Sequence, residues 1–210
     1  MKPLPDWSGV WQLTGGWAAT LDAYAGEVSL TPTYQAIRKQ AYDEKRQANL
    51  STCLPAGSTA VLQHATLHEY LFTPGRVTML FEDGEVRRIF TDGRAHRPLS
   101  ELRNSFMGDS IGHWEGDTLV VDTIGFPNGE LWQNYGVRAT INTRLLERIH
   151  LTANGELQID NTLTDPAIFA KPYVYTRRYK RSSLPLEEPA CVQNNRDNGE
   201  VVDLTPPPEE

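Results

Sequence analysis

The chain has 210 residues, of which 39% are hydrophobic and 22% charged, and its formal net charge is −7. These values are typical of a soluble protein with a single globular domain. Residues 186–210 hold seven acidic side chains and one arginine, so this end contributes −6 and leaves −1 for the remainder. A nearly neutral body excludes an extended electrostatic surface for nucleic acid. No apolar run reaches the roughly 18 residues that a membrane-spanning helix needs.

The two ends of the sequence predict location and domain limits. The start, MKPLPDWSGVW, lacks the apolar core of a signal peptide, so we expect a cytoplasmic protein, or a periplasmic or secreted one if a leader was removed. We expect one domain over residues 1–200 and a solvated, acidic, proline-rich tail over 201–210. Cys53 and Cys191 form no CxxC motif, which leaves a disulfide and two free thiols both open.

One helix is predicted in the first quarter of the chain, after a strand over residues 8–14. Thr31 followed by Pro32 is typical of a helix start, because threonine caps the first turn and proline suits the first helical position. Near-helical spacing then predicts an amphipathic helix over about 32–48. Its inward-facing residues are expected to be Tyr34, Ile37 and Ala41.

Strands dominate the rest of the sequence. Residues 61–72 read as a strand, and Asp83-Gly84 predicts a hairpin between strands over 77–82 and 85–91. Residues 173–181 form the last predicted strand, in which Tyr173, Tyr175 and Tyr179 share one face. Many short strands with turn signals and one helix predict a mainly β protein: an antiparallel, lipocalin-like meander closed into a barrel.

The register of the hairpin around Asn154-Gly155 follows from its apolar pattern. A three-residue loop, 153–155, places the apolar residues of both strands on one face and sets Arg148 opposite Asp160. A two-residue loop would oppose apolar to polar residues. We therefore predict the three-residue loop, with Gly155 in the left-handed conformation.

The stretch 109–126 combines strand signal with possible chemistry. If its turn is Gly116-Asp117, then Asp109, His113 and Asp122 share one face, within reach of a histidine–carboxylate contact. A carboxylate orients an imidazole and suits it to proton transfer near neutral pH. If the loop is one residue longer, Asp122 moves to the face of Trp114. We take His113, Asp109 and Asp122 as the candidate catalytic residues.

Several further residues are candidates for binding a substrate or a metal. Arg94 and His96 follow a turn and are expected at the barrel mouth, and late amide and guanidinium donors suit an oxyanion. The predicted substrate-binding set is Arg94, His96, Trp114, Tyr175, Asn194, Asn195 and Arg196. His64 and His68 share a strand face, but their order with Glu69 is not HExxH, so they are weak metal candidates and we predict no metal.

Five segments together resemble a known family: DWSGVW at 6–11, FTPGRV at 72–77, RRIFTDGRAH at 87–96, IGHWEGDTLVVDT at 111–123 and NNRD at 194–197. The chain is similar to uncharacterised bacterial proteins common in sphingomonad-type and soil genomes, which often carry export signals. That family has a histidine where this chain has Asp109, so the chemistry at this position differs if it is catalytic in relatives. SGVW followed by a meander also resembles lipocalin-like (calycin) barrels.

These features predict an enzyme without a cofactor. We expect a lyase, dehydratase or isomerase that acts on a small aromatic or apolar metabolite in a barrel cavity, with His113 moving a proton. The alternative is a non-catalytic, lipocalin-like binding protein with the same cavity. Neither nucleic acid nor membrane is an expected partner, and a homodimer is possible.

Overall fold

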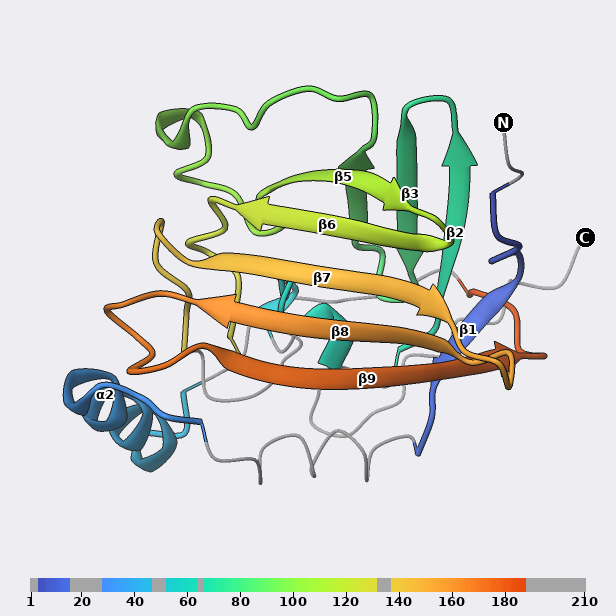
Figure 1. Ribbon diagram of the computed structural model, residues 1–210. Helices are drawn as coiled ribbons and strands as arrows, with labels where there is room; N and C mark the ends of the chain where they lie inside the picture. Colours follow the sequence, from blue (N-terminus) through green and yellow to red (C-terminus); the bar gives the residue numbers. More distant parts are fainter. Residues whose placement is uncertain (1–3, 16–27, 47–51, 64–65, 132–136, 188–210) are drawn as a thin grey trace, which may run out of the picture.

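The computed structural model describes residues 4–15, 28–46, 52–63, 66–131 and 137–187. Within these ranges, nine strands close into a barrel in chain order, and one α-helix lies outside it (Figure 1). The strands are β1 (Val10–Leu13), β2 (His68–Thr73), β3 (Arg76–Phe81), β4 (Val86–Phe90), β5 (Asp109–Glu115), β6 (Thr118–Ile124), β7 (Arg144–Leu151), β8 (Leu157–Thr164) and β9 (Tyr173–Ser182). The predicted mainly β barrel with one helix is confirmed.

One neighbouring pair departs from the predicted antiparallel meander. β4 and β5 run parallel and pair at only two positions, Ile89 with Ser110 and Phe90 with Ile111. The segment between them, residues 91–108, crosses over and holds one short 3-10 helix, η3 (Leu99–Glu101). Parallel strands need such a crossover, because the chain must return to the end of the sheet where it began. The short pairing leaves the barrel wall weakly joined here.

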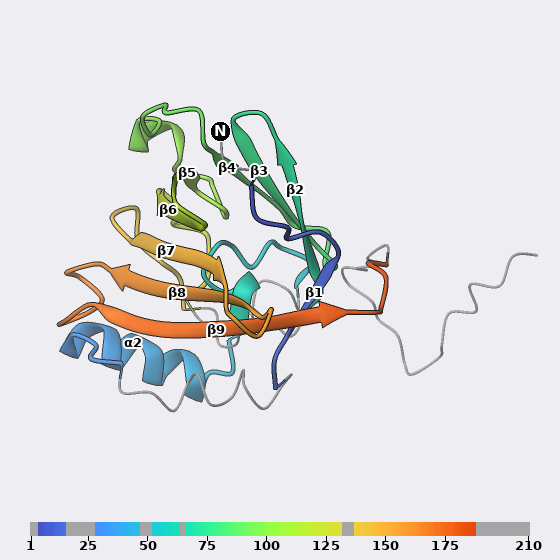
Figure 2. The same ribbon diagram turned by 45° about the vertical axis from the view of Figure 1, so that its right-hand side comes forward.

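The helix α2 (Pro32–Asp43) begins as the sequence predicts. The Thr31 side chain accepts a hydrogen bond from the backbone amide of Tyr34, and Pro32 occupies the first turn. The helix ends before the predicted residue 48 and buries only Ala41 fully. It lies outside the barrel beside β9 in both views (Figures 1 and 2), and the Tyr34 hydroxyl donates to the carbonyl of Arg138.

The structure decides between the two loop lengths left open for one hairpin and confirms the predicted register of another. In β5–β6, Glu115 pairs with Thr118, so the turn is the two-residue Gly116-Asp117. In β7–β8, Leu151 pairs with Leu157 and Arg148 with Asp160, as the three-residue loop requires. Gly155 has a φ of 77°, in the left-handed region.

The strand predicted over residues 61–72 is correct only in its second half. Val61–Gln63 form a buried 3-10 turn, η2, and β2 begins at His68. The Gln63 amide donates to the carbonyls of Thr59 and Leu131, which fixes the turn against the loop after β6. These tertiary hydrogen bonds override the strand propensity of the segment.

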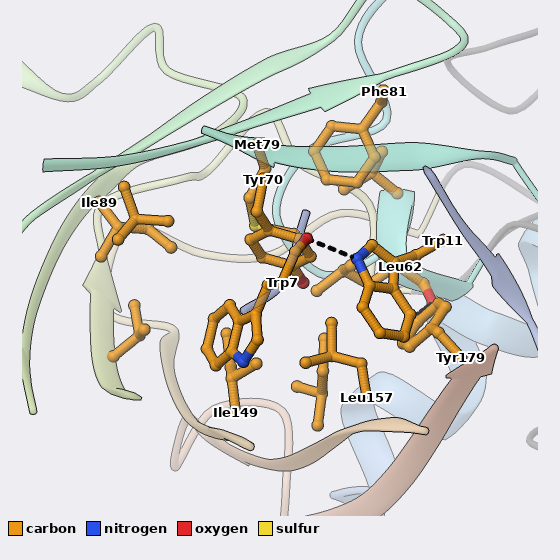
Figure 3. Packing of buried hydrophobic residues seen from close by; sticks show 14 of the residues in the cluster. Trp7, Trp11, Leu62, Tyr70, Met79, Phe81, Ile89, Ile149, Leu157 and Tyr179 are labelled. Atoms are coloured by element: carbon orange, nitrogen blue, oxygen red, sulfur yellow. Dashed lines mark hydrogen bonds between the residues drawn. The ribbon is translucent and has the colours of Figure 1, made fainter. Parts of the chain in front are cut away.

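Two apolar clusters extend into the barrel, and polar residues lie between them. The larger cluster includes Trp7 and Trp11, both without exposed surface, and the indole of Trp11 donates to the carbonyl of Trp7 (Figure 3). Along β7, the inward residues pass from Leu145 of the smaller cluster through Glu147 to Ile149 of the larger one. Inward residues of β8 and β9 follow the same order. We call Arg87, Glu147, Asn161, Tyr175 and Arg177 the polar layer.

Candidate functional site

The predicted face of Asp109, His113 and Asp122 exists, but it is the outer face of the barrel. Asp122 pairs with Leu146 of β7, whereas Val121 pairs with the buried Glu147, so the odd-numbered residues of β6 point inward. The His113 side chain is 67% exposed, and its Nε2 lies 3.2 Å from Oε1 of Glu115. The expectation that His113 faces a barrel cavity is therefore wrong. Inward and outward faces cannot be told apart from register alone.

A different histidine, His96, joins the two aspartates. Its Nδ1 lies 2.9 Å from Oδ2 of Asp109, and its Nε2 lies 3.2 Å from Oδ2 of Asp122. The His96 side chain is 18% exposed, and that of Asp109 only 2%. The crossover segment brings His96 over the outer face, and the Asp92-Gly93 turn starts that path with a φ of 81° at the glycine. Sequence reasoning found all three residues but assigned His96 to substrate binding.

Two arginines complete this cluster and keep its carboxylates charged. Arg97 Nε donates to Asp109 at 2.8 Å, and Arg144 donates twice to Asp122, at 2.7 and 2.6 Å. Burial raises the pKa of Asp109, but the hydrogen bonds from Arg97 and His96 outweigh it, so the pKa lies below its usual value. The pKa of Asp122 is lowered in the same way: hydrogen bonds from Arg144 and His96 outweigh burial.

A pocket of about 310 Å³ opens beside the cluster, where β4 and β5 diverge. Arg94 and Arg97 from the crossover line it, together with Asp109. The Arg94 guanidinium stacks 3.8 Å from the centroid of Phe90 and pairs with Asp92. Arg88 also lines the pocket, which is thus bordered by several cations and suits a substrate with an anionic group.

Arg87, which the sequence did not predict as a site residue, also lines this pocket, and its side chain points into the barrel. Arg87 is 1% exposed and forms a two-pronged ion pair with Glu147, which has no exposed surface. Its remaining contacts are to the hydroxyls of Ser110 and Thr123, at 3.2 and 2.8 Å. The sequence did carry one sign of this buried pair: a glutamate, the partner of Arg87, interrupts the inward-facing apolar residues of β7 between Leu145 and Ile149.

The predicted aromatic residues separate into two places. Trp114 points inward, where its ring centroid lies 5.4 Å from that of Trp7. It also lines a second pocket of about 610 Å³ with Phe72 and Leu4 at one end of the barrel. Tyr175 is partly buried against Tyr173, in the smaller apolar cluster, with ring centroids 5.0 Å apart. These residues do not form one site.

Four of the remaining predicted residues, His64, Asn194, Asn195 and Arg196, lie outside the described residues. His68 is buried among aromatic rings, and burial lowers its pKa to about 3. Within the described ranges, no group of three histidine, cysteine or acidic side chains is arranged to hold a metal.

Two wider observations bear on the class of protein. Cys53 is disulfide-bonded, and the other cysteine, Cys191, lies outside the described residues. No described helix is long and apolar enough to cross a membrane. The fold therefore defines the chain as a closed nine-stranded β-barrel with a charged cluster on its outer wall. No family model matches it, and none of the curated proteins does.

Proposed function

We propose that the protein is a cofactor-independent acid–base enzyme whose proton-transfer residue is His96. One observation carries the proposal: the imidazole lies between the carboxylates of Asp109 and Asp122, and Asp109 also lines an arginine-bordered pocket. Oriented histidines of this kind are common general acids and bases. The proposal keeps the two predicted aspartates and replaces His113 by His96.

The geometry suggests how the site would move a proton. The contacts with both carboxylates suit a protonated ring, in which Nδ1 donates to Asp109 and Nε2 donates to Asp122. Once Nε2 has given up its proton, Nδ1 still donates to Asp109 and the Nε2 lone pair can accept a proton from a substrate. A substrate would displace Asp122, whose contact with Nε2 is the longer one at 3.2 Å. The oxyanion that forms would be held by Arg94 or Arg97 at the pocket rim. Loss of a leaving group makes the reaction a lyase or dehydratase reaction, and return of the proton elsewhere makes it an isomerisation.

The substrate class follows from the lining of the pocket. Phe90 and Met107 supply apolar surface, and the arginines supply charge. A small aromatic compound with an acidic C–H or O–H group fits both. We propose such a compound as the substrate, acted on in the cytoplasm.

Proton exchange in D₂O tests the proposal even when the product is unidentified. A panel of small aromatic ketones, hydroxy acids and phenols is incubated with the protein and followed by ¹H NMR. We expect exchange or elimination with at least one compound, and a loss of about 10²–10⁴-fold in rate for His96→Gln. His113→Gln is the matched comparison on the same outer face. If His113→Gln loses the activity and His96→Gln retains it, the assignment to His96 is wrong.

A binding protein without chemistry is the second candidate. The pocket of about 610 Å³ favours it, because Phe72 and Trp114 give that pocket an apolar, aromatic wall. In this case an aromatic ligand quenches tryptophan fluorescence, no compound of the panel exchanges protons, and Trp114→Ala weakens binding while His96→Gln does not.

A further inference from the structure

Arg177 is a buried cation without a carboxylate partner among the described residues. The residue is 7% exposed and lies on the inner face of β9, where it pairs across the sheet with the fully buried Ile159. Its Nη1 donates to the carbonyl of Thr176 at 3.2 Å. Its Nε and Nη2 atoms are buried and have no hydrogen-bond partner within the described part of the chain. A buried guanidinium in this condition is costly, because the donors have lost water without replacing it.

The charges nearby do not neutralise Arg177. Glu147, the carboxylate of the polar layer, is already occupied by both ends of the Arg87 guanidinium. Burial raises the pKa of Tyr175 and that of Tyr179 far above the usual value of a tyrosine, so both phenols stay neutral. The polar layer therefore carries one positive charge more than its described side chains balance.

The free donors have a geometry that selects a ligand. Nε and Nη2 lie on one edge of the planar guanidinium, and this edge matches the two oxygens of a carboxylate. The guanidinium carbon lies 4.9 Å from the centroid of the Tyr175 ring, which holds the plane of the fork. The matching edge of Arg87 is closed, because its Nε and Nη2 contact Ser110 and Thr123. Arg177 alone in this layer thus has an open fork, as far as the described ranges extend.

A second unpartnered group lies close to the fork. Asn161 pairs with Tyr175, so it is a diagonal neighbour of Arg177 on the inner face of β8. Its amide nitrogen donates to the carbonyl of Ile159, whereas its Oδ1 is buried and accepts no hydrogen bond from the described residues. The two residues thus offer a pair of hydrogen-bond donors for an anion and, beside them, one hydrogen-bond acceptor. This arrangement complements a ligand that carries a carboxylate and a hydroxyl group.

We propose that the barrel interior binds a small carboxylic acid, with its carboxylate on the Nε–Nη2 edge of Arg177 and a hydroxyl donor directed to Asn161. This site is separate from the His96 cluster, which lies on the outer face, and it does not rest on the proposed activity. Binding would supply the missing negative charge and the missing donor together.

Titration calorimetry of the whole chain with five compounds tests the proposal: acetate, benzoate, benzamide, 4-hydroxybenzoate and inorganic phosphate. We expect a carboxylate to bind, with benzamide, the neutral analogue of benzoate, at least tenfold weaker. Arg177→Met should weaken the carboxylate at least tenfold, and Arg177→Lys by a smaller factor, because lysine keeps the charge without the fork. Arg178→Met is the matched control, since Arg178 is the next residue, faces outward and donates to Gln158; it should change affinity less than twofold.

Three results would overturn the proposal. These are no binding of any carboxylate to the wild-type chain, equal affinity for the wild type and Arg177→Met, or tighter binding of phosphate than of the carboxylates. Near-ultraviolet circular dichroism shows whether Arg177→Met folds. If it does not fold, Arg177→Lys is used instead, and an unchanged carboxylate affinity in that variant would show that the guanidinium edge does not bind the ligand. Asn161→Leu tests the second contact: it should remove the preference for 4-hydroxybenzoate over benzoate, and an unchanged preference would rule this contact out.

Discussion

Arg87 and Glu147 come from strands that are not neighbours and meet inside the barrel as a fully buried ion pair. Such a pair adds little net stability, because both charges lose their hydration. Removing one partner costs much more stability, since the remaining charge is left buried without a partner. Arg87 also lines the pocket beside the His96 cluster, so loss of the pair would alter both stability and the candidate site.

We therefore expect Glu147→Gln to lower the free energy of unfolding by about 3–5 kcal/mol. Urea denaturation measures it. Arg148→Met is the matched control, because Arg148 is the next residue and makes a half-exposed pair with Glu115; it should cost at most about 1 kcal/mol. Equal effects of the two variants would show that the buried pair does not have the energetic role described.

His68 gives the protein a defined pH dependence. Burial holds the pKa of His68 at about 3 in the folded chain, against an ordinary value of 6.5. Below pH 6.5 the unfolded chain takes up a proton that the folded chain does not. Stability is therefore lost as pH falls from 6.5 towards 3. Glu85 acts in the opposite sense, because burial raises its pKa to about 7 and its contribution is lost as pH rises.

Comparing the wild type with His68→Phe isolates the contribution of the histidine to the pH dependence of stability, since Glu85 is present in both proteins. Between about pH 7 and pH 5 the wild type should lose about 2 kcal/mol relative to this variant, as expected for roughly 1.5 pH units of linkage. Urea midpoints at the two pH values, with equal slopes, provide the measurement. A pH-independent gap between wild type and His68→Phe would contradict the buried, neutral state of His68.

At the scale of elements, glycines with positive φ decide where strands can start and turn. Gly108, immediately before β5, has a φ of 70°, and a Cβ there would lie 2.4 Å from the carbonyl oxygen of Ile124. Gly155, in the β7–β8 loop, has a similar φ of 77°, but no described atom lies within 4 Å of its Cβ position. The two glycines share a left-handed backbone conformation, but only at Gly155 is there room for a Cβ atom.

Replacement by alanine should separate these two effects. Gly155→Ala is expected to cost about 1–2 kcal/mol, the strain of a left-handed alanine. Gly108→Ala should cost clearly more, because the β6 backbone must also move, and it should disturb the pocket that Gly108 lines. Chemical denaturation of both variants gives the comparison. A larger loss for Gly155→Ala would contradict the close approach at Gly108.

At the scale of the whole molecule, the first and last strands close the barrel. β1 pairs with β9 through Val10–Ser182 and Leu13–Tyr179. The segment before β1 also places Trp7 inside, against Tyr70, Phe72 and Trp114. Closure removes the free sheet edges, and the entering tryptophan fills one end of the interior.

Trp7→Ala should therefore cost about 3–5 kcal/mol, as do other deletions of large buried side chains. Leu4→Ala, in the same segment but 53% exposed, should cost less than about 0.5 kcal/mol. Thermal and urea unfolding can be compared for both. We expect one cooperative transition in each variant, because the described strands form a single closed sheet. A small effect of Trp7→Ala would show that this end of the barrel repacks without it.

The sequence alone determined several local features. Alternating apolar residues and turn chemistry defined the register of β7–β8, the left-handed Gly155 and the start of α2 at Thr31, because these depend on residues close in the chain. For β5–β6 they left two loop lengths open, one of which places Asp109 and Asp122 on one face. Turn and strand patterns in the sequence also identified His96 and Tyr175 as candidate site residues.

Only the tertiary structure decided which histidine joins the aspartates. A strand pattern shows which residues share a face but not which face is inside, so His113 was predicted inward and lies outward. The contact of His96 depends on the path of the crossover, residues 91–108, and on the parallel pairing of β4 and β5. The polar layer with its open arginine fork likewise arises from residues on several strands, which the local pattern of any one strand cannot bring together.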